Sequence, residues 1–143
     1  MALFSPFPSY VVGGLCLALG SNAILRPVHE YERFGLPLES TTSGVGRRSQ
    51  PPLAGAASPL MYLKGIREIT YGLALISLQY AEQDDAVTIL AAVLSFAGLG
   101  DGFVVWGYGG DKLKKNAFGH WITFVGFAGW AWWRVLCVRA TLP

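Results

Sequence analysis

The sequence is poor in charged residues, which make up 14% of its 143 positions, whereas hydrophobic residues make up 52%. Soluble domains carry about 25% charged residues, because their surface must be hydrated. The composition therefore excludes a water-soluble bundle and favours a single membrane domain over 1–143. Five tryptophans and six tyrosines suit the two bilayer interfaces, where an apolar ring with one polar atom is favoured.

Several sequence patterns that carry known chemistry are also missing. The two cysteines, Cys16 and Cys137, both lie in apolar stretches, so we expect free thiols that pack as small hydrophobes. No cysteine and histidine spacing predicts a metal site, and no glycine-rich loop lies in the strand–helix context of a dinucleotide site. No basic cluster alternates with aromatic residues, which argues against nucleic acid as a partner. We expect no metal and no cofactor.

Four apolar stretches dominate the chain, at 10–25, 60–80, 86–108 and 117–138. Each is close to the ~20 residues that cross the hydrocarbon core of a bilayer, although the first is short. Backbone polar groups in lipid must be paired within the protein, so helix is the expected structure. The predicted fold class is all-α, a transmembrane four-helix bundle. The first stretch lacks a basic start and a small-residue cleavage site, so we expect it to remain as a span.

The connections between these stretches differ in composition. The first connection is long, and its segment 27–37 mixes aromatic with charged residues, a composition that can pack on the bundle. Its segment 41–59 is rich in Gly, Ser, Ala and Pro, which predicts a flexible cytoplasmic loop. The second connection is short and acidic, and the third is short and basic.

The distribution of basic residues predicts the orientation. Four spans place the first and third connections on one side, together with Arg26, Arg33, Arg47, Arg48, Lys112, Lys114 and Lys115. Cytoplasmic loops carry an excess of Lys and Arg, so loops 26–59 and 109–116 are expected in the cytoplasm and both termini in the lumen. We expect an integral protein of the endoplasmic reticulum membrane.

Ionisable residues inside the apolar stretches are the most informative ones, because a charge at the centre of a span costs about 3 kcal/mol or more. Arg67 and Asp101 each lie about seven residues, or ~10 Å, from the cytoplasmic boundary. His120 and Asn22 lie ~5 Å from it. All four stretches therefore place a polar group in one layer.

This layer predicts a polar pocket at the cytoplasmic end of an apolar bundle. An arginine stays protonated and pairs with a carboxylate, here Asp101 or Glu68. A histidine, two carboxylates and an arginine can supply a general acid, a general base and oxyanion stabilisation. The predicted catalytic residues are Asp101, His120, Glu68 and Arg67. The predicted substrate-binding residues are Asn22, Tyr71, Trp106, Trp121 and Phe124.

Each of these residues also has a structural interpretation. Arg67 and Asp101 can form a buried pair that fixes helix register. Glu68 can pair with Lys64 one turn earlier, and His120 can bind a backbone carbonyl. The aromatic residues can be packing residues and interface anchors.

Small residues predict where helices approach closely. Ser95, Gly98 and Gly102 form a stripe that allows close packing on the third stretch, and Gly126 and Gly129 are expected to do the same on the fourth.

The order of several short motifs resembles a known family. The sequence Gly65-Ile66-Arg67-Glu68 is followed by Gly72, then by Gly100-Asp101 and by His120, and a Phe34-Gly35-Leu36-Pro37 turn follows the first stretch. This pattern resembles a fungal family of small four-span membrane proteins of unknown function, distantly similar to DoxX-like proteins. The resemblance covers roughly 11–136 and implies a tailoring step on a polyketide or terpenoid, because members are often associated with natural-product pathways.

Three functions are compatible with these observations. The first is a cofactor-independent membrane enzyme, a cyclase, isomerase or epoxide-opening hydrolase, acting by acid–base chemistry on a lipophilic natural-product intermediate. The second is a non-catalytic scaffold or partner subunit of a biosynthetic pathway. The third is a small-molecule transporter, for which four short spans would have to oligomerise. The expected partners are a lipophilic small-molecule substrate and membrane lipid, with a homo-oligomer or a pathway enzyme as further candidates.

Overall fold

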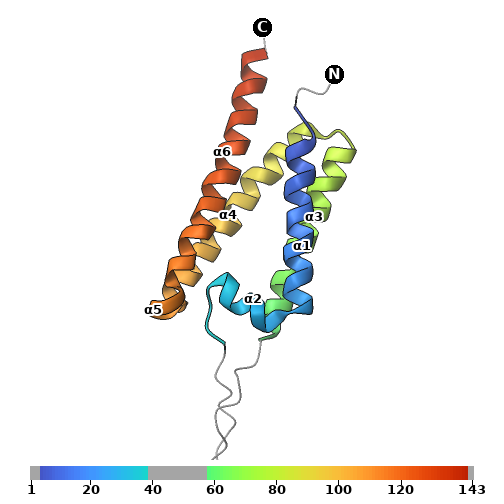
Figure 1. The fold of residues 1–143 in the computed structure, drawn as a ribbon. Coiled ribbons are helices and arrows are strands. Elements are labelled where there is room, and N and C mark those ends of the chain that lie inside the picture. Colours follow the sequence, from blue (N-terminus) through green and yellow to red (C-terminus); the bar gives the residue numbers. More distant parts are fainter. Residues whose placement is uncertain (1–3, 39–57, 142–143) are drawn as a thin grey trace, which may run out of the picture.

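The regular structure of the protein is helical throughout residues 4–38 and 58–141, the parts that the computed structural model describes. Figure 1 shows the arrangement. The elements are α1 (Phe7–Leu25), α2 (Pro27–Phe34), α3 (Pro59–Tyr80), α4 (Asp84–Tyr108), α5 (Gly110–Leu113), a 3-10 turn (Lys114–Asn116) and α6 (Ala117–Thr141). The predicted all-α class is confirmed, and each apolar stretch lies within a long helix whose ends differ from the prediction by at most three residues.

Proline, serine and glycine set several helix ends. α2 begins at Pro27, where the missing N–H costs nothing, and ends at Phe34, because the next residue, Gly35, has a left-handed φ of 105°. α3 begins at Pro59, and the Ser58 hydroxyl accepts a hydrogen bond from the backbone N–H of Leu60. The predicted loop 41–59 therefore overlaps the helix by one residue, Pro59, and its residues 41–57 lie outside the described residues.

The four long helices form two tightly packed pairs. α1 packs along α3, and α4 packs along α6, while α3 and α4 contact each other much less. In the first pair, glycines allow the backbones to touch. A Cβ atom on Gly20 would lie 2.5 Å from the carbonyl oxygen of Gly65, and one on Gly13 would lie 3.0 Å from that of Gly72. This is the close approach that small residues permit between membrane helices.

The second pair uses the small-residue stripe that the sequence predicts. A Cβ atom on Gly98 would lie 3.0 Å from the backbone of α6 at His120, and one on Gly102 would collide with the Trp121 ring. The prediction for Gly126 and Gly129 is wrong within this chain, because nothing lies within 4 Å of a Cβ atom at either position. Both positions are exposed on α6.

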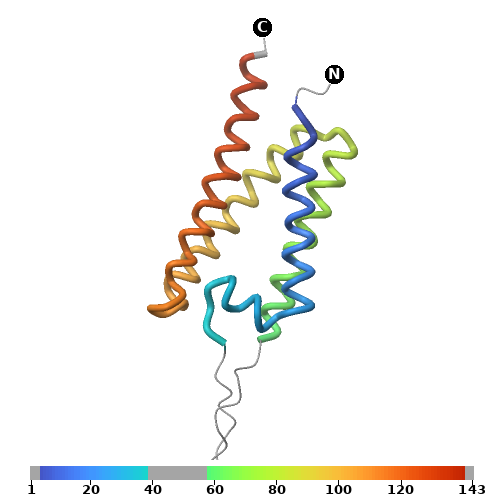
Figure 2. Tube along the Cα trace, in the orientation of Figure 1, coloured from blue at the N-terminus to red at the C-terminus, as the bar shows by residue number. Residues whose placement is uncertain are grey.

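Helix α2 bridges the two pairs. Figures 1 and 2 show it lying across the end at which α4 has diverged from α3. Its Tyr31 packs against Ala23 of α1 and Met61 of α3. Its Phe34 packs in a separate cluster with Val105 of α4 and with α6. One short helix therefore closes the open end of the bundle through two aromatic side chains.

The opposite end is closed by polar contacts. Arg134 of α6 is 1% exposed. Its guanidinium donates to the Asp84 carboxylate at 2.9 Å and to the Thr88 hydroxyl at 2.7 Å, both on the first turn and a half of α4. Phe4 stacks on the guanidinium, with the ring centroid 4.0 Å away. These contacts pair the buried guanidinium and hold α4 and α6 together at this end.

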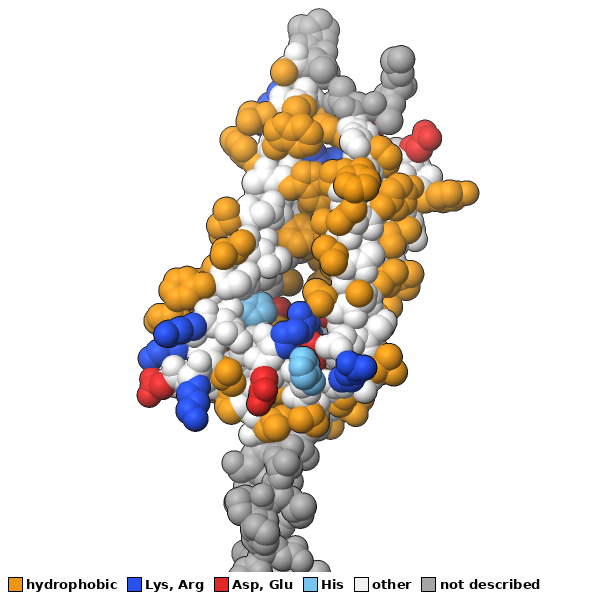
Figure 3. All heavy atoms as spheres, in the orientation of Figure 1, with side chains coloured by type: hydrophobic (Ala, Val, Ile, Leu, Met, Phe, Trp, Pro, Cys, Tyr) orange, Lys and Arg blue, Asp and Glu red, His pale blue; other side chains and the backbone are white. Residues whose placement is uncertain are grey.

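Length and composition identify a membrane protein. Among the described residues, three segments are long and apolar enough to cross a bilayer, namely Phe7–Leu25, Asp84–Tyr108 and Gly110–Ala140. The prediction of four spans is not confirmed by this criterion, because α3 does not meet it. The reason lies in Lys64, Arg67 and Glu68, three charges within a helix of 22 residues. In Figure 3 apolar side chains cover most of the visible length, and most charges gather at the end where α2 and α5 lie.

Candidate functional site

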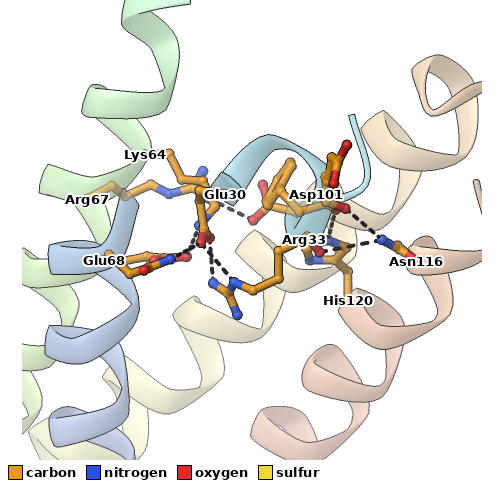
Figure 4. A network of polar contacts seen from close by, with 11 residues as sticks. Glu30, Arg33, Lys64, Arg67, Glu68, Asp101, Asn116 and His120 are labelled. Carbon is orange, nitrogen blue, oxygen red and sulfur yellow. Dashed lines mark hydrogen bonds and ion pairs between the residues drawn. The ribbon is translucent and has the colours of Figure 1, made fainter. Parts of the chain in front are cut away.

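A cavity of about 460 Å³ lies between the two helix pairs. Its upper walls are apolar and come from α1, α4 and α6, with Val12, Leu15, Leu19, Leu94 and Phe127. Its other end, near α2, is lined by ionisable side chains from four helices: Glu30, Arg33, Lys64, Arg67, Glu68, Asp101 and His120. The four residues predicted to be catalytic therefore line one cavity, and Figure 4 shows them in the network around α2.

Glu30 is the centre of the network at the polar end. Its side chain is fully buried and accepts hydrogen bonds from Asn22 at 2.7 Å, from Nε of Arg33 at 2.8 Å and from Nζ of Lys64 at 3.0 Å. Burial acts to raise the pKa of Glu30, but the hydrogen bonds from Arg33, Lys64 and Asn22 and the charge of Lys64 outweigh it. The pKa therefore lies below the usual glutamate range. The hydrogen bond to Glu30 raises the pKa of Arg33 above its usual value.

Lys64 connects this network to Glu68. Its Nζ lies 2.6 Å from Oε1 of Glu68, one turn further along α3. The structure thus contains the contact on which the structural interpretation of Glu68 depends. The second oxygen, Oε2, is buried and has no hydrogen-bond partner in the described parts of the chain. A buried carboxylate oxygen without a partner is uncommon in proteins and marks a place where a ligand donor can bind.

Arg67 and Asp101 form an ion pair between the two helix pairs. Nη2 of Arg67 lies 2.7 Å from Oδ2 of Asp101, and the two side chains are 37% and 20% exposed. Nε of Arg67 is buried and, like Glu68 Oε2, lacks a partner among the described residues. Both residues also line a second cavity of about 420 Å³.

His120 is held in one orientation by α2. Its Nε2 lies 2.8 Å from the carbonyl oxygen of Phe34, and its ring packs edge-on against the Phe34 ring at 4.6 Å. Because a carbonyl oxygen only accepts, Nε2 must carry the hydrogen. In the neutral ring Nδ1 is then the nitrogen that can accept a proton. The contact also matches the structural interpretation, in which the histidine binds a backbone carbonyl.

The residues predicted to bind substrate are placed differently from one another. Tyr71 lines the cavity. Asn22 donates to Glu30 behind the cavity wall. The ring of Trp121 packs against Gly102 of α4, as the packing interpretation of the aromatic residues describes, and the backbone of Phe124 lies against Gly98. Trp106 is 49% exposed on the outer surface, where it contacts the rings of Phe118 and Trp121.

Sequence reasoning missed Glu30 and Arg33. Both lie in the segment 27–37, which is expected to pack on the bundle but belongs to a polar connection outside the apolar stretches, so neither is predicted from the sequence to belong to the site. A signal was present. Pro27 and Gly35 mark the start and stop of a short helix, and Glu30, Tyr31 and Phe34 share its buried side. An acid that shares the buried side of a helix with two aromatic residues indicates a paired charge.

The comparison with known families decides the identification. The profile of a family described as "Domain of unknown function (DUF4267)" matches residues 13–134. The chain belongs to the DUF4267 family. The match runs from α1 to Arg134 and so includes both helix pairs, α2 and every residue of the polar cavity end. No curated protein and no solved structure matches the chain significantly.

This DUF4267 chain holds its ionisable groups mainly in cation–carboxylate pairs. Across the described ranges, no three side chains of the His, Cys, Asp and Glu types converge closely enough to hold a metal ion. The chemistry that the cavity offers through its own side chains is proton transfer and charge stabilisation.

Proposed function

We propose that the protein is a cofactor-independent membrane enzyme that acts by acid–base chemistry on a lipophilic natural-product intermediate. The observation that carries this proposal is that Glu68, Asp101, His120 and Arg67, from three helices, line one largely apolar cavity. The volume of 460 Å³ falls within the range of about 300–1,000 Å³ that is usual for small-molecule sites. The reaction class is cyclisation, isomerisation or epoxide opening.

Each residue has a role that follows from its contacts. His120 accepts a proton at Nδ1, because Nε2–H is committed to the Phe34 carbonyl. Asp101 is held by Arg67 through Oδ2 and exchanges a proton through Oδ1, and Glu68 does so through the unpartnered Oε2. Arg67 stabilises negative charge that develops on a substrate oxygen. The apolar walls accommodate the hydrocarbon body of the substrate.

The test uses isotope transfer from solvent, since it detects all three reactions. Membranes containing the protein are incubated with candidate lipophilic intermediates in heavy water or oxygen-18 water, and products are analysed by mass. Isomerisation or cyclisation leaves deuterium on carbon, and epoxide opening leaves the heavy oxygen.

Variants identify the residues that act. We expect Asp101→Asn and His120→Ala each to lose about 100-fold or more in rate, which is typical of removing an acid–base group. Asp111→Asn is the matched control, because the Asp111 side chain is 98% exposed outside the cavity. Wild-type rates in both cavity variants would refute the proposal.

A scaffold function is the second candidate, and one observation favours it. The contacts Arg67–Asp101, Lys64–Glu68 and His120–Phe34 are those expected of residues with purely structural roles. A scaffold predicts copurification with a pathway enzyme and no isotope incorporation by purified protein. Incorporation by the protein alone would exclude it.

The proposed enzyme is a fungal protein of the endoplasmic reticulum, distantly DoxX-like, with four spans. α3 is the fourth span, because its 22 residues are long enough and its three charges line the cavity rather than face lipid. Both termini are lumenal, and loops 26–59 and 109–116 are cytoplasmic. The variants Asp111→Cys and Glu82→Cys, each in a background without Cys16 and Cys137, test this orientation. In sealed microsomes an impermeant maleimide should label only the first, and the reverse pattern would contradict it.

A further inference from the structure

The polar end of the cavity has no unpaired charge. Three cations line it, Arg33, Lys64 and Arg67, and three carboxylates line it, Glu30, Glu68 and Asp101. Each of the six takes part in an ion pair within the network. A ligand with a charged head would therefore bury its charge without a free counter-charge, which is strongly unfavourable.

Among the described residues, two polar atoms at this end are buried without a hydrogen-bond partner. These atoms are Nε of Arg67 and Oε2 of Glu68. The Nε–H group can only donate and the carboxylate oxygen can only accept. A ligand that satisfies both must present one acceptor and one donor, and it must do so without a charge of its own.

The remaining walls specify the rest of the ligand. Away from this end the lining is apolar, with Val12, Leu15, Leu19, Leu94 and Phe127. A hydrocarbon body gains free energy from leaving water for such walls, whereas a second polar group would lose its hydration there.

We propose that the ligand of this cavity is an uncharged lipophile of the hydroxy-ketone type. Its hydroxyl donates to Oε2 of Glu68, its carbonyl oxygen accepts from Nε of Arg67, and its hydrocarbon body lies between α1, α4 and α6. The inference rests on the proposed function only in taking this cavity as the substrate site. It specifies the substrate class that the acid–base groups meet.

Matched probes test this class on the full-length protein in detergent. Hydroxymethyl decyl ketone, methyl decyl ketone, dodecanoate and dodecylamine have chains of equal length and differ only in the head. Thermal unfolding at a series of probe concentrations gives an apparent affinity for each, because a ligand that binds the folded state raises the midpoint. We expect the hydroxy ketone to bind about ten-fold more tightly than the plain ketone, and both charged probes to bind more weakly than either ketone.

A variant assigns the preference to Glu68. In Glu68→Gln the advantage of the hydroxy ketone over the plain ketone should fall from about ten-fold to about two-fold, as the side chain can turn an amide N–H towards the ligand. Glu32→Gln is the control with the same charge change, because Glu32 is exposed on α2. In Glu32→Gln the advantage of the hydroxy ketone over the plain ketone should stay at the wild-type value. The probe comparison in wild-type protein needs no variant, so the inference stays testable if Glu68→Gln does not fold.

Each outcome bears on the ligand class separately from the enzyme. Equal or tighter binding of dodecanoate or dodecylamine would overturn the class, and so would binding of none of the four probes. Neither result would change the turnover rates of Asp101→Asn and His120→Ala, which test the enzyme proposal. Selective binding of the hydroxy ketone without isotope incorporation would support the class and favour a non-catalytic binding protein.

Discussion

Nη2 of Arg67 lies 2.7 Å from Oδ2 of Asp101, which joins α3 to α4 in the part of the bundle where the two helix pairs are apart. The ion pair lines the cavity on one side and a second cavity on the other. Neither side chain is fully buried. The ion pair should therefore contribute little to stability. The effects of substituting Asp101 on chemistry and on folding can then be separated.

Asp101→Asn should lower the free energy of unfolding by about 1 kcal/mol, because partly exposed ion pairs stabilise weakly. Reversible unfolding in mixed micelles measures this loss. Asp111→Asn should change nothing, since Asp111 is 98% exposed. A loss of about 4 kcal/mol or more in Asp101→Asn would mean that the pair is a buried structural element, and the loss of activity would then be a folding effect.

Gly20→Ala should destabilise the protein by about 2 kcal/mol, because the added methyl group would lie 2.5 Å from the Gly65 carbonyl oxygen and force α1 away from α3. Gly14→Ala, in the same helix, places its methyl group where nothing lies within 4 Å. It should be neutral or stabilising by up to about 1 kcal/mol. The same unfolding assay compares the two variants, and equal effects would contradict the observed pairing of α1 with α3.

The long helices could be predicted from the sequence because each is a mainly apolar stretch of nearly bilayer length. The polar layer could be predicted as well, since charges such as Asp101 interrupt runs that otherwise lack them. The stripe at Gly98 and Gly102 could be recognised from its spacing and is used as predicted.

The arrangement of the helices could not be predicted. Hydrophobic periodicity indicates which face is buried but not which helix it packs against, so the division into two pairs was not foreseen. Arg67 had two candidate partners, Asp101 and Glu68, which differ by 33 positions along the chain and are indistinguishable by charge alone. Helix α2 has 8 residues, too few for a clear periodic signal, and the partners of Glu30 come from α1 and α3 as well as α2.

Lowering the pH should lower the free energy of unfolding, because Glu30 then becomes protonated. The pKa of Glu30 is below the usual glutamate range in the folded state, since its contacts with Arg33, Lys64 and Asn22 outweigh the effect of burial. The unfolded chain then binds the proton more readily, so this contribution is complete above the ordinary pKa of about 4.3 and is lost as the pH falls through the lower folded value.

Unfolding free energies measured from about pH 6 to about pH 3 test this dependence. Glu30→Gln should be less stable than wild type at about pH 6 and lose less stability on acidification, because it has no carboxylate to protonate. Glu32→Gln, an exposed neighbour on the same helix, should keep the wild-type slope. If the free energy of unfolding fell with pH by the same amount in wild type and Glu30→Gln, Glu30 would not be the cause of the acid dependence.

Arg134→Met should lower the free energy of unfolding by about 3 kcal/mol while leaving the cavity intact. The change removes a guanidinium that is 1% exposed and leaves Asp84 and Thr88 without their donor. Arg139→Met, at an exposed position near the end of α6, is the control. Loss of turnover in Arg134→Met without loss of stability would contradict this prediction. It would mean that the end of the bundle around Arg134 belongs to the catalytic site.

Filling the cavity tests most directly the claim that chemistry takes place between the two helix pairs. Ala97 of α4 lines the cavity, whereas Ala18 of α1 is exposed on the outside. The rate of isotope incorporation is measured for Ala97→Phe and Ala18→Phe, with thermal midpoints to verify folding. The account predicts that Ala97→Phe folds but retains less than about a tenth of the rate, because the ring occupies the substrate volume, and that Ala18→Phe retains all of it. Equal, wild-type rates in both variants would contradict it.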